Sequence, residues 1–110
     1  MLHCSMNDPT VIDPLRDRLE DLAAEIGHAR RDMDLGHLAA LCYCEVRPWA
    51  RRSGESTLAD LSWRLSTQQL PLDRNTFLAQ IDRLIEELEQ ACARAGIEKA
   101  ATQLRLARAA

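Results

Sequence analysis

Apolar positions recur in a four-three rhythm along residues 75–96, while charged side chains fill the positions between them. A spacing of four, three, four, three and four places every one of these apolar residues on a single stripe of an α-helix. The pattern predicts an amphipathic helix about 30 Å long, against which the other segments pack. The stripe residues are Phe77, Ile81, Leu84, Leu88, Ala91 and Ala95.

The same rhythm appears near the N-terminus, between Leu15 and Met33. Asp13-Pro14 precedes it and is typical of a helix start, because proline is tolerated in the first turn. Residues 1–12 show no apolar period, so we expect a flexible N-terminal arm followed by one domain over residues 13–110.

Between these two helices the sequence predicts two more. Residues 35–46 are apolar on nearly all sides, with Asp34 as the expected N-cap and Pro48 ending or kinking the helix. Residues 49–56 are predicted to form a loop. Residues 57–70 are predicted to form a helix with Leu58, Leu61 and Leu65 on its main stripe.

A last helix is expected after the Gly96 stop, over residues 97–110, with a frayed end. No stretch alternates apolar and polar residues over the length of a strand. The sequence therefore predicts an all-α fold, an up-and-down bundle of four helices plus a short C-terminal fifth helix.

Composition and charge limit the partners and the cellular compartment that we expect. The chain has 110 residues and a net charge of -3, which gives no general attraction to nucleic acid or to an anionic membrane. No apolar run approaches the roughly 18 residues that cross a bilayer, and the N-terminus lacks the pattern of a secretory signal. We expect a cytoplasmic protein with reduced cysteines. Arginine outnumbers lysine thirteen to one, which favours a GC-rich bacterial source.

The sequence contains no clear catalytic or metal-binding motif. Cys42 and Cys44 form a C-x-C pair that projects to opposite sides of a helix, with no second ligand pair downstream, so zinc is not predicted. Histidines are available to pair with a cysteine, but no thiol lies at an activating helix start. The four glycines are scattered, so phosphate-binding and dinucleotide-binding loops are also not predicted. We expect a non-enzyme without a cofactor.

The N-terminal tripeptide is a separate metal candidate. The free amine of Met1, two backbone amides and the His3 imidazole would form a square-planar site for Cu(II) or Ni(II). Such tripeptides arise easily by chance, and translation from Met6 would remove the site. We therefore predict no physiological metal role.

Surface recognition remains, and residues 47–63 are the most unusual stretch for it. Tryptophan and arginine are common binding anchors, and this stretch holds both tryptophans of the chain. On a helix, Trp63 points about 140° away from Leu58. The predicted partner-binding residues are Trp49, Arg51, Arg52 and Trp63; in the alternative, Trp49 plugs the end of the bundle and the arginines are solvated.

Self-association is also expected, because a short bundle with few aromatic residues gains stability by pairing with itself. The predicted homodimer face is on the long helix, at Ile81, Leu84 and Leu88. The alternative is that this stripe is internal core.

The function predicted by elimination is a non-catalytic protein-protein interaction module, a small bacterial regulator such as an inhibitor, an anti-activator or a chaperone-like protein, which masks a surface of a partner protein. The runner-up is a nucleic-acid-associated transcriptional regulator that uses the Arg47–Arg52 basic patch, although the acidic long helix makes nucleic acid an unfavoured partner. An enzyme or a metal-handling protein ranks below both.

Overall fold

The computed structural model describes residues 14–67 and 73–109, and within these ranges the chain is helical with no strand. The predicted all-α class is confirmed. The predicted arm over residues 1–12 lies outside the described residues. The elements are α2 (Pro14–Arg31), α3 (Leu35–Leu41), a π-helical turn (Cys42–Val46), α4 (Arg47–Ser53), α5 (Ser56–Thr67), α6 (Arg74–Arg94) and α7 (Glu98–Ala109).

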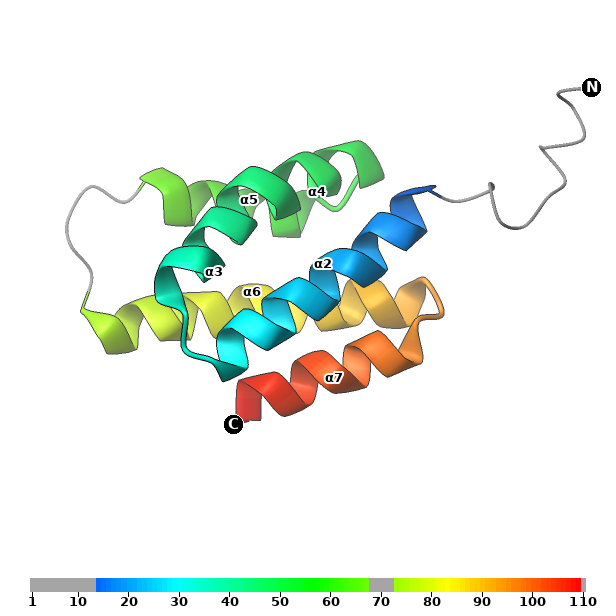
Figure 1. The fold of residues 1–110 in the computed structure, drawn as a ribbon. Helices are drawn as coiled ribbons and strands as arrows, with labels where there is room; N and C mark the ends of the chain where they lie inside the picture. The colour runs from blue at the N-terminus through cyan, green and yellow to red at the C-terminus, as the bar shows by residue number, and fades with distance from the viewer. Residues whose placement is uncertain (1–13, 68–72, 110) are drawn as a thin grey trace, which may run out of the picture.

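The helix that begins at Leu35 continues through Pro48, because a π-helical turn precedes the proline. Pro48 has no N–H, and in a regular α-helix its ring collides with the carbonyl of Cys44, four residues earlier. In the π-helical turn the Arg47 N–H instead bonds to the Cys42 carbonyl, five residues back, so the backbone is wider there. The chain thus passes the proline without leaving the helix (Figure 1).

The predicted loop over residues 49–56 is therefore wrong. α4 extends to Ser53, and only Gly54 and Glu55 separate it from α5. Gly54 has a φ of +74°, a left-handed conformation that a glycine adopts without strain and that ends α4. The turn is far shorter than the composition of this stretch suggests.

Both ends of the long helix α6 follow the sequence signals. Asp73 is the N-cap, and its carboxylate accepts a hydrogen bond of 2.8 Å from the Thr76 backbone N–H. Gly96, with a φ of +79°, ends the helix, and the Ile97 N–H bonds to the Cys92 carbonyl at 2.8 Å. These local contacts fix where α6 begins and ends.

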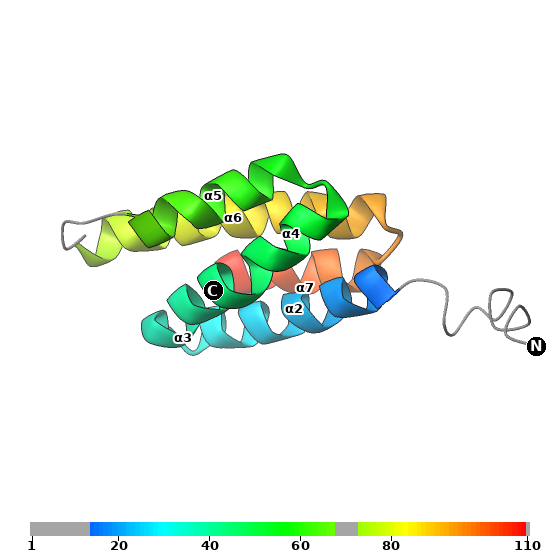
Figure 2. The same cartoon turned by 90° about the horizontal axis from the view of Figure 1, so that it is seen from above.

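α3, the π-helical turn and α4 form one continuous rod, which runs opposite to α2; α5, α6 and α7 then alternate in direction along the long axis of the molecule (Figures 1 and 2). α7 packs against both α6 and α2, and α5 packs against α4, the π-helical turn and α6. In α7, Leu104 and Ala107 are fully buried. The C-terminal helix that was predicted over residues 97–110 is therefore present over Glu98–Ala109 and packs as a full member of the bundle.

The stripe of α6 faces the core. Ile81, Leu84 and Leu88 each have 0% exposure and belong to the one hydrophobic cluster that the described helices share. The predicted self-association face is therefore corrected: these side chains are not available at the surface of the folded chain. The rhythm is the same for a helix that packs within its own chain and for one that packs against a second copy.

Candidate functional site

Two large aromatic side chains lie at the surface on either side of one arginine. Trp63, on α5, is 47% exposed, and Tyr43, on the π-helical turn, is 44% exposed. The Arg47 guanidinium carbon lies 4.8 Å from the centre of the Trp63 ring and 6.0 Å from that of the Tyr43 ring. Both distances suit cation–π attraction, so we treat these residues as one unit, the Tyr43–Arg47–Trp63 cluster.

Helix geometry explains why Trp63 is outside. α5 buries Leu58 and Ser62 and half-buries Leu65, so its core face is centred on these positions. Five residues beyond Leu58, Trp63 is rotated by about 140° from that face. Its exposure agrees with the predicted position, and Arg47 of the neighbouring helix α4 covers part of its ring.

Trp49 does not join this surface. Its side chain is 4% exposed, and its indole Nε1 donates a hydrogen bond of 2.7 Å to the Leu15 carbonyl in the first turn of α2. Because α4 continues past Pro48, Trp49 faces the core instead of a loop. The prediction of Trp49 as an exposed partner anchor is corrected: it ties α4 to α2.

Arg51 and Arg52 are both exposed in the last turn of α4, where the helix dipole favours positive charge. Neither guanidinium has an ion pair within the described ranges. Arg51 is four residues after Arg47 and so extends the same side of the helix. Arg52 instead borders a hollow that Trp49 also lines. Of the four predicted partner-binding residues, Arg51 and Trp63 therefore lie on the side of the cluster, whereas Trp49 and Arg52 do not.

Tyr43 and Arg47 complete the cluster; Tyr43 was not predicted as a site residue, and Arg47 was predicted only as part of the alternative basic patch. Their spacing of four residues is the signal that pairs them, because side chains at i and i+4 on a helix are neighbours. That signal was hidden by the expectation that Pro48 ends or kinks the helix directly after Arg47. Only the continuous helix shows that the two residues present one face.

The thiols in the core are poor nucleophiles. Burial raises the pKa of Cys42 to about 12 and, aided by nearby carboxylates, that of Cys92 to about 11. Both therefore remain protonated at neutral pH, whereas Cys44 is exposed. Among residues 14–67 and 73–109, no three His, Cys, Asp or Glu side chains are grouped to hold a metal ion. His3 lies outside the described residues.

The described helices also lack a membrane-spanning candidate, since none is both long and apolar enough to cross a bilayer. No protein-family model, curated protein or solved structure matches the chain. Function is therefore inferred from the described side chains.

Proposed function

We propose that the chain is a non-catalytic protein-binding module that covers a surface of a partner protein with the Tyr43–Arg47–Trp63 cluster. The observation that carries the proposal is the half-exposed Trp63 ring with Arg47 stacked 4.8 Å from its centre. Tryptophan and arginine are enriched among residues that dominate binding energy. Stacking holds both side chains in place before a partner arrives, which lowers the entropy lost on binding.

The partner surface is expected to be acidic around an apolar centre. Arg47 has no carboxylate partner among the described residues, and neither has Arg51. A guanidinium that lies over an aromatic ring can still donate its N–H groups to a carboxylate while the indole contacts apolar atoms. The cluster and Arg51 together thus fit an acidic protein surface.

We place this activity in a small cytoplasmic bacterial regulator, such as an inhibitor, an anti-activator or a chaperone-like protein. The arginine-rich composition and the reduced, buried thiols support that setting. The exposed aromatic and arginine side chains of the cluster suit a protein that acts by masking a surface of another protein.

Affinity capture from the native cell, with the purified chain as bait, tests the proposal. Trp63→Ala and the double variant Arg47→Ala with Arg51→Ala are each expected to weaken partner binding by more than about 1 kcal/mol, with little change in melting temperature. Arg105→Ala, which removes an exposed arginine from α7, is the matched control. Equal capture by wild type and both cluster variants would refute the proposal. Loss of capture after nuclease treatment would instead favour nucleic acid, to which an exposed tryptophan beside arginines can also bind.

A further inference from the structure

A second surface feature lies away from the cluster, along the seam between α2 and α7 (Figure 1). It is a shallow groove of about 280 Å³ with a floor of small side chains and polar side chains along its rim. The floor residues are Ala23, Ala24, Gly27 and Ala100, and the rim residues are Glu20, Arg31, Lys99 and Gln103.

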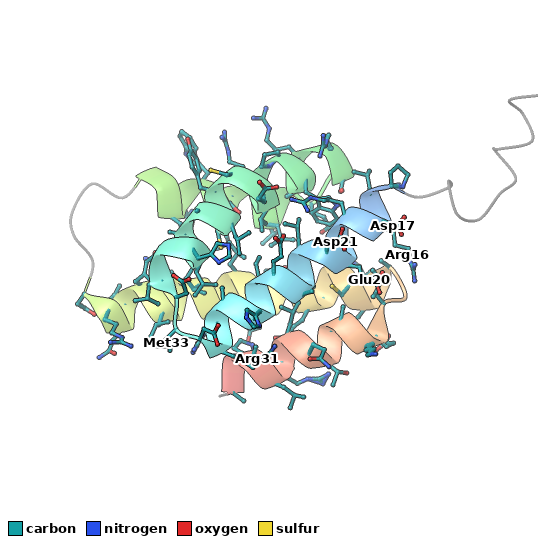
Figure 3. All side chains as sticks on the ribbon, viewed as in Figure 1. Arg16, Asp17, Glu20, Asp21, Arg31 and Met33 are labelled. Carbon is teal, nitrogen blue, oxygen red and sulfur yellow. The ribbon has the colours of Figure 1, made fainter. Side chains whose placement is uncertain are left out.

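The α2 side of the groove has a symmetric order of side chains. Glu20, Ala24, Gly27 and Arg31 follow one another at spacings of four, three and four, so they form one strip along the helix. An acidic residue stands at one end of the strip, a basic residue at the other, and two small residues in the middle. Figure 3 shows Glu20 and Arg31 toward opposite ends of α2.

We propose that this groove is the self-association surface of the protein, with the α2 helices of two copies antiparallel across a two-fold axis midway between Ala24 and Gly27. In that register Glu20 of one copy faces the partner's Arg31, and Arg31 faces the partner's Glu20. The exposed Ala24 of each copy faces the α2 backbone of the other copy beside the axis, and its small side chain allows the two helices to approach closely. A two-fold axis makes each of these contacts twice.

The charges favour a second copy over another occupant. Within the described ranges neither Glu20 nor Arg31 has an ion pair in the single chain, and both are exposed. An acidic segment in the groove would meet Glu20 with like charge, and a basic segment would meet Arg31 in the same way. An antiparallel copy of α2 places a positive charge opposite Glu20 and a negative charge opposite Arg31.

The centre of the strip can accept a neighbouring helix. A Cβ atom built on Gly27 would have ordinary contacts of 3.9 Å with Ala107, Leu104 and the Arg31 guanidinium, so Gly27 is not required by packing within the chain. Gly27 itself is buried, with its Cβ direction toward α7, so the exposed small side chain at the centre of the strip is that of Ala24. The Arg31 guanidinium lies over Gly27 and is expected to turn toward the partner's Glu20 on association.

α7 adds apolar area beside the groove. Leu106 is 60% exposed, the most exposed large hydrophobic residue in the described ranges. It lies three residues after Gln103 and seven after Lys99, on the side of α7 that borders the groove. Association through the groove would bring this side of α7 close to the second copy. The same arrangement would leave the Tyr43–Arg47–Trp63 cluster of each copy free.

Sedimentation equilibrium over a range of concentrations tests the proposal by charge reversal. The wild type is expected to reach twice the mass of the 12.4 kDa chain at or below about 100 µM. Glu20→Arg alone, or Arg31→Glu alone, is expected to raise the dimer dissociation constant about tenfold or more, because two like-charged contacts replace two complementary ones. The double variant restores opposite charges and is expected to recover the dimer. Ala24→Gln, at the axis, is expected to weaken it by steric obstruction.

Arg105→Glu is the matched control for Arg31→Glu, since it reverses an exposed arginine on the other side of α7. It is expected to leave the dissociation constant unchanged. A wild type that remains monomeric would overturn the proposal. A dimer that persists in both single reversals, or one that the double reversal fails to recover while the melting temperature stays normal, would overturn this register. None of these outcomes bears on the cluster, so the two proposals fail independently.

Discussion

Arg30, on α2, binds Asp82, on α6, through two parallel hydrogen bonds. Its Nε donates to Oδ1 at 2.8 Å and its Nη2 to Oδ2 at 3.2 Å, and the Arg30 side chain is only 9% exposed. The hydrogen bond from Asp82 raises the pKa of Arg30 further above its ordinary value. We expect Arg30→Ala to lower the free energy of unfolding by about 1.5–3 kcal/mol, because it leaves a partly buried carboxylate without its partner.

Urea unfolding followed by circular dichroism measures this effect. A double-mutant cycle with Asp82→Ala should show that the combined loss is smaller than the sum of the single losses. Arg105→Ala, on the surface, should change stability by less than about 0.5 kcal/mol. Additive losses would show that the two side chains contribute separately.

The two tryptophans should differ in fluorescence. In Trp63→Phe the remaining Trp49 is buried, so its emission is expected at short wavelength and protected from iodide. In Trp49→Phe the remaining Trp63 is half-exposed, so iodide should quench it. Equal quenching of the two variants would contradict the burial of Trp49.

Trp49→Phe also removes the hydrogen bond to the Leu15 carbonyl while it keeps an aromatic ring in the core. We expect the free energy of unfolding to fall by about 1–3 kcal/mol, because the buried carbonyl loses its donor. Trp49→Ala should cost about 3–5 kcal/mol. Thermal or urea unfolding of both variants provides the comparison, and a neutral Trp49→Ala would place this side chain outside the core.

Stability should fall in alkaline solution. The ordinary thiol pKa is 9.0, whereas in the folded chain burial raises the pKa of Cys42 to about 12 and that of Cys92 to about 11. The unfolded chain therefore loses these protons first, so the contribution to stability is complete below about pH 9 and declines as the pH rises toward the folded values. The decline is at most about 1.4 kcal/mol per pH unit for each thiol.

Urea unfolding between about pH 8 and pH 10.5 measures this slope. The variant with Cys42→Ala and Cys92→Ala is expected to be less stable at pH 8 but to show a shallower decline. Cys44→Ser changes an exposed thiol and should retain the wild-type slope. An unchanged slope in the double variant would mean that other groups cause the decline.

Glutamate on the stripe of α6 should unfold the chain instead of merely dissociating a dimer. Leu84 has 0% exposure, so Leu84→Glu places a carboxylate in the core and is expected to cost more than about 4 kcal/mol. Leu106→Glu makes the same change at a site with 60% exposure and should leave the helical signal and the melting temperature nearly intact. A Leu84→Glu protein that is folded but monomeric would show that the self-association face is on α6 after all.

Local signals predicted much of the fold. Asp34 caps α3 by accepting from the His37 N–H, Gly96 ends α6, and the four-three rhythm located α2 and α6. Each of these features depends on neighbours within about four residues along the chain, which is the range that a sequence pattern reports. The all-α class followed directly from them.

The predictions that failed depend on contacts between distant segments or on the path of the helix at Pro48. Periodicity identified the face of α6 that holds Leu84, but it cannot say whether α7 or a second chain covers that face. Trp49 is buried because the helix continues through Pro48, and it continues because the π-helical turn makes room for the proline. Trp63 was placed off the core stripe correctly, yet its contact with Arg47 needed the helix to continue.

The π-helical turn also marks a place where the length of the chain can change. Such a turn holds one residue more than an α-helical turn does, and the helix on either side keeps its direction and its exposed face. A homologue without Pro48 would have no need of the wider turn, and it could lose one residue between Cys42 and Val46 while both halves of the helix kept their contacts. In an evolutionary comparison, a one-residue gap is therefore to be expected in this turn, and there it would leave the fold unchanged.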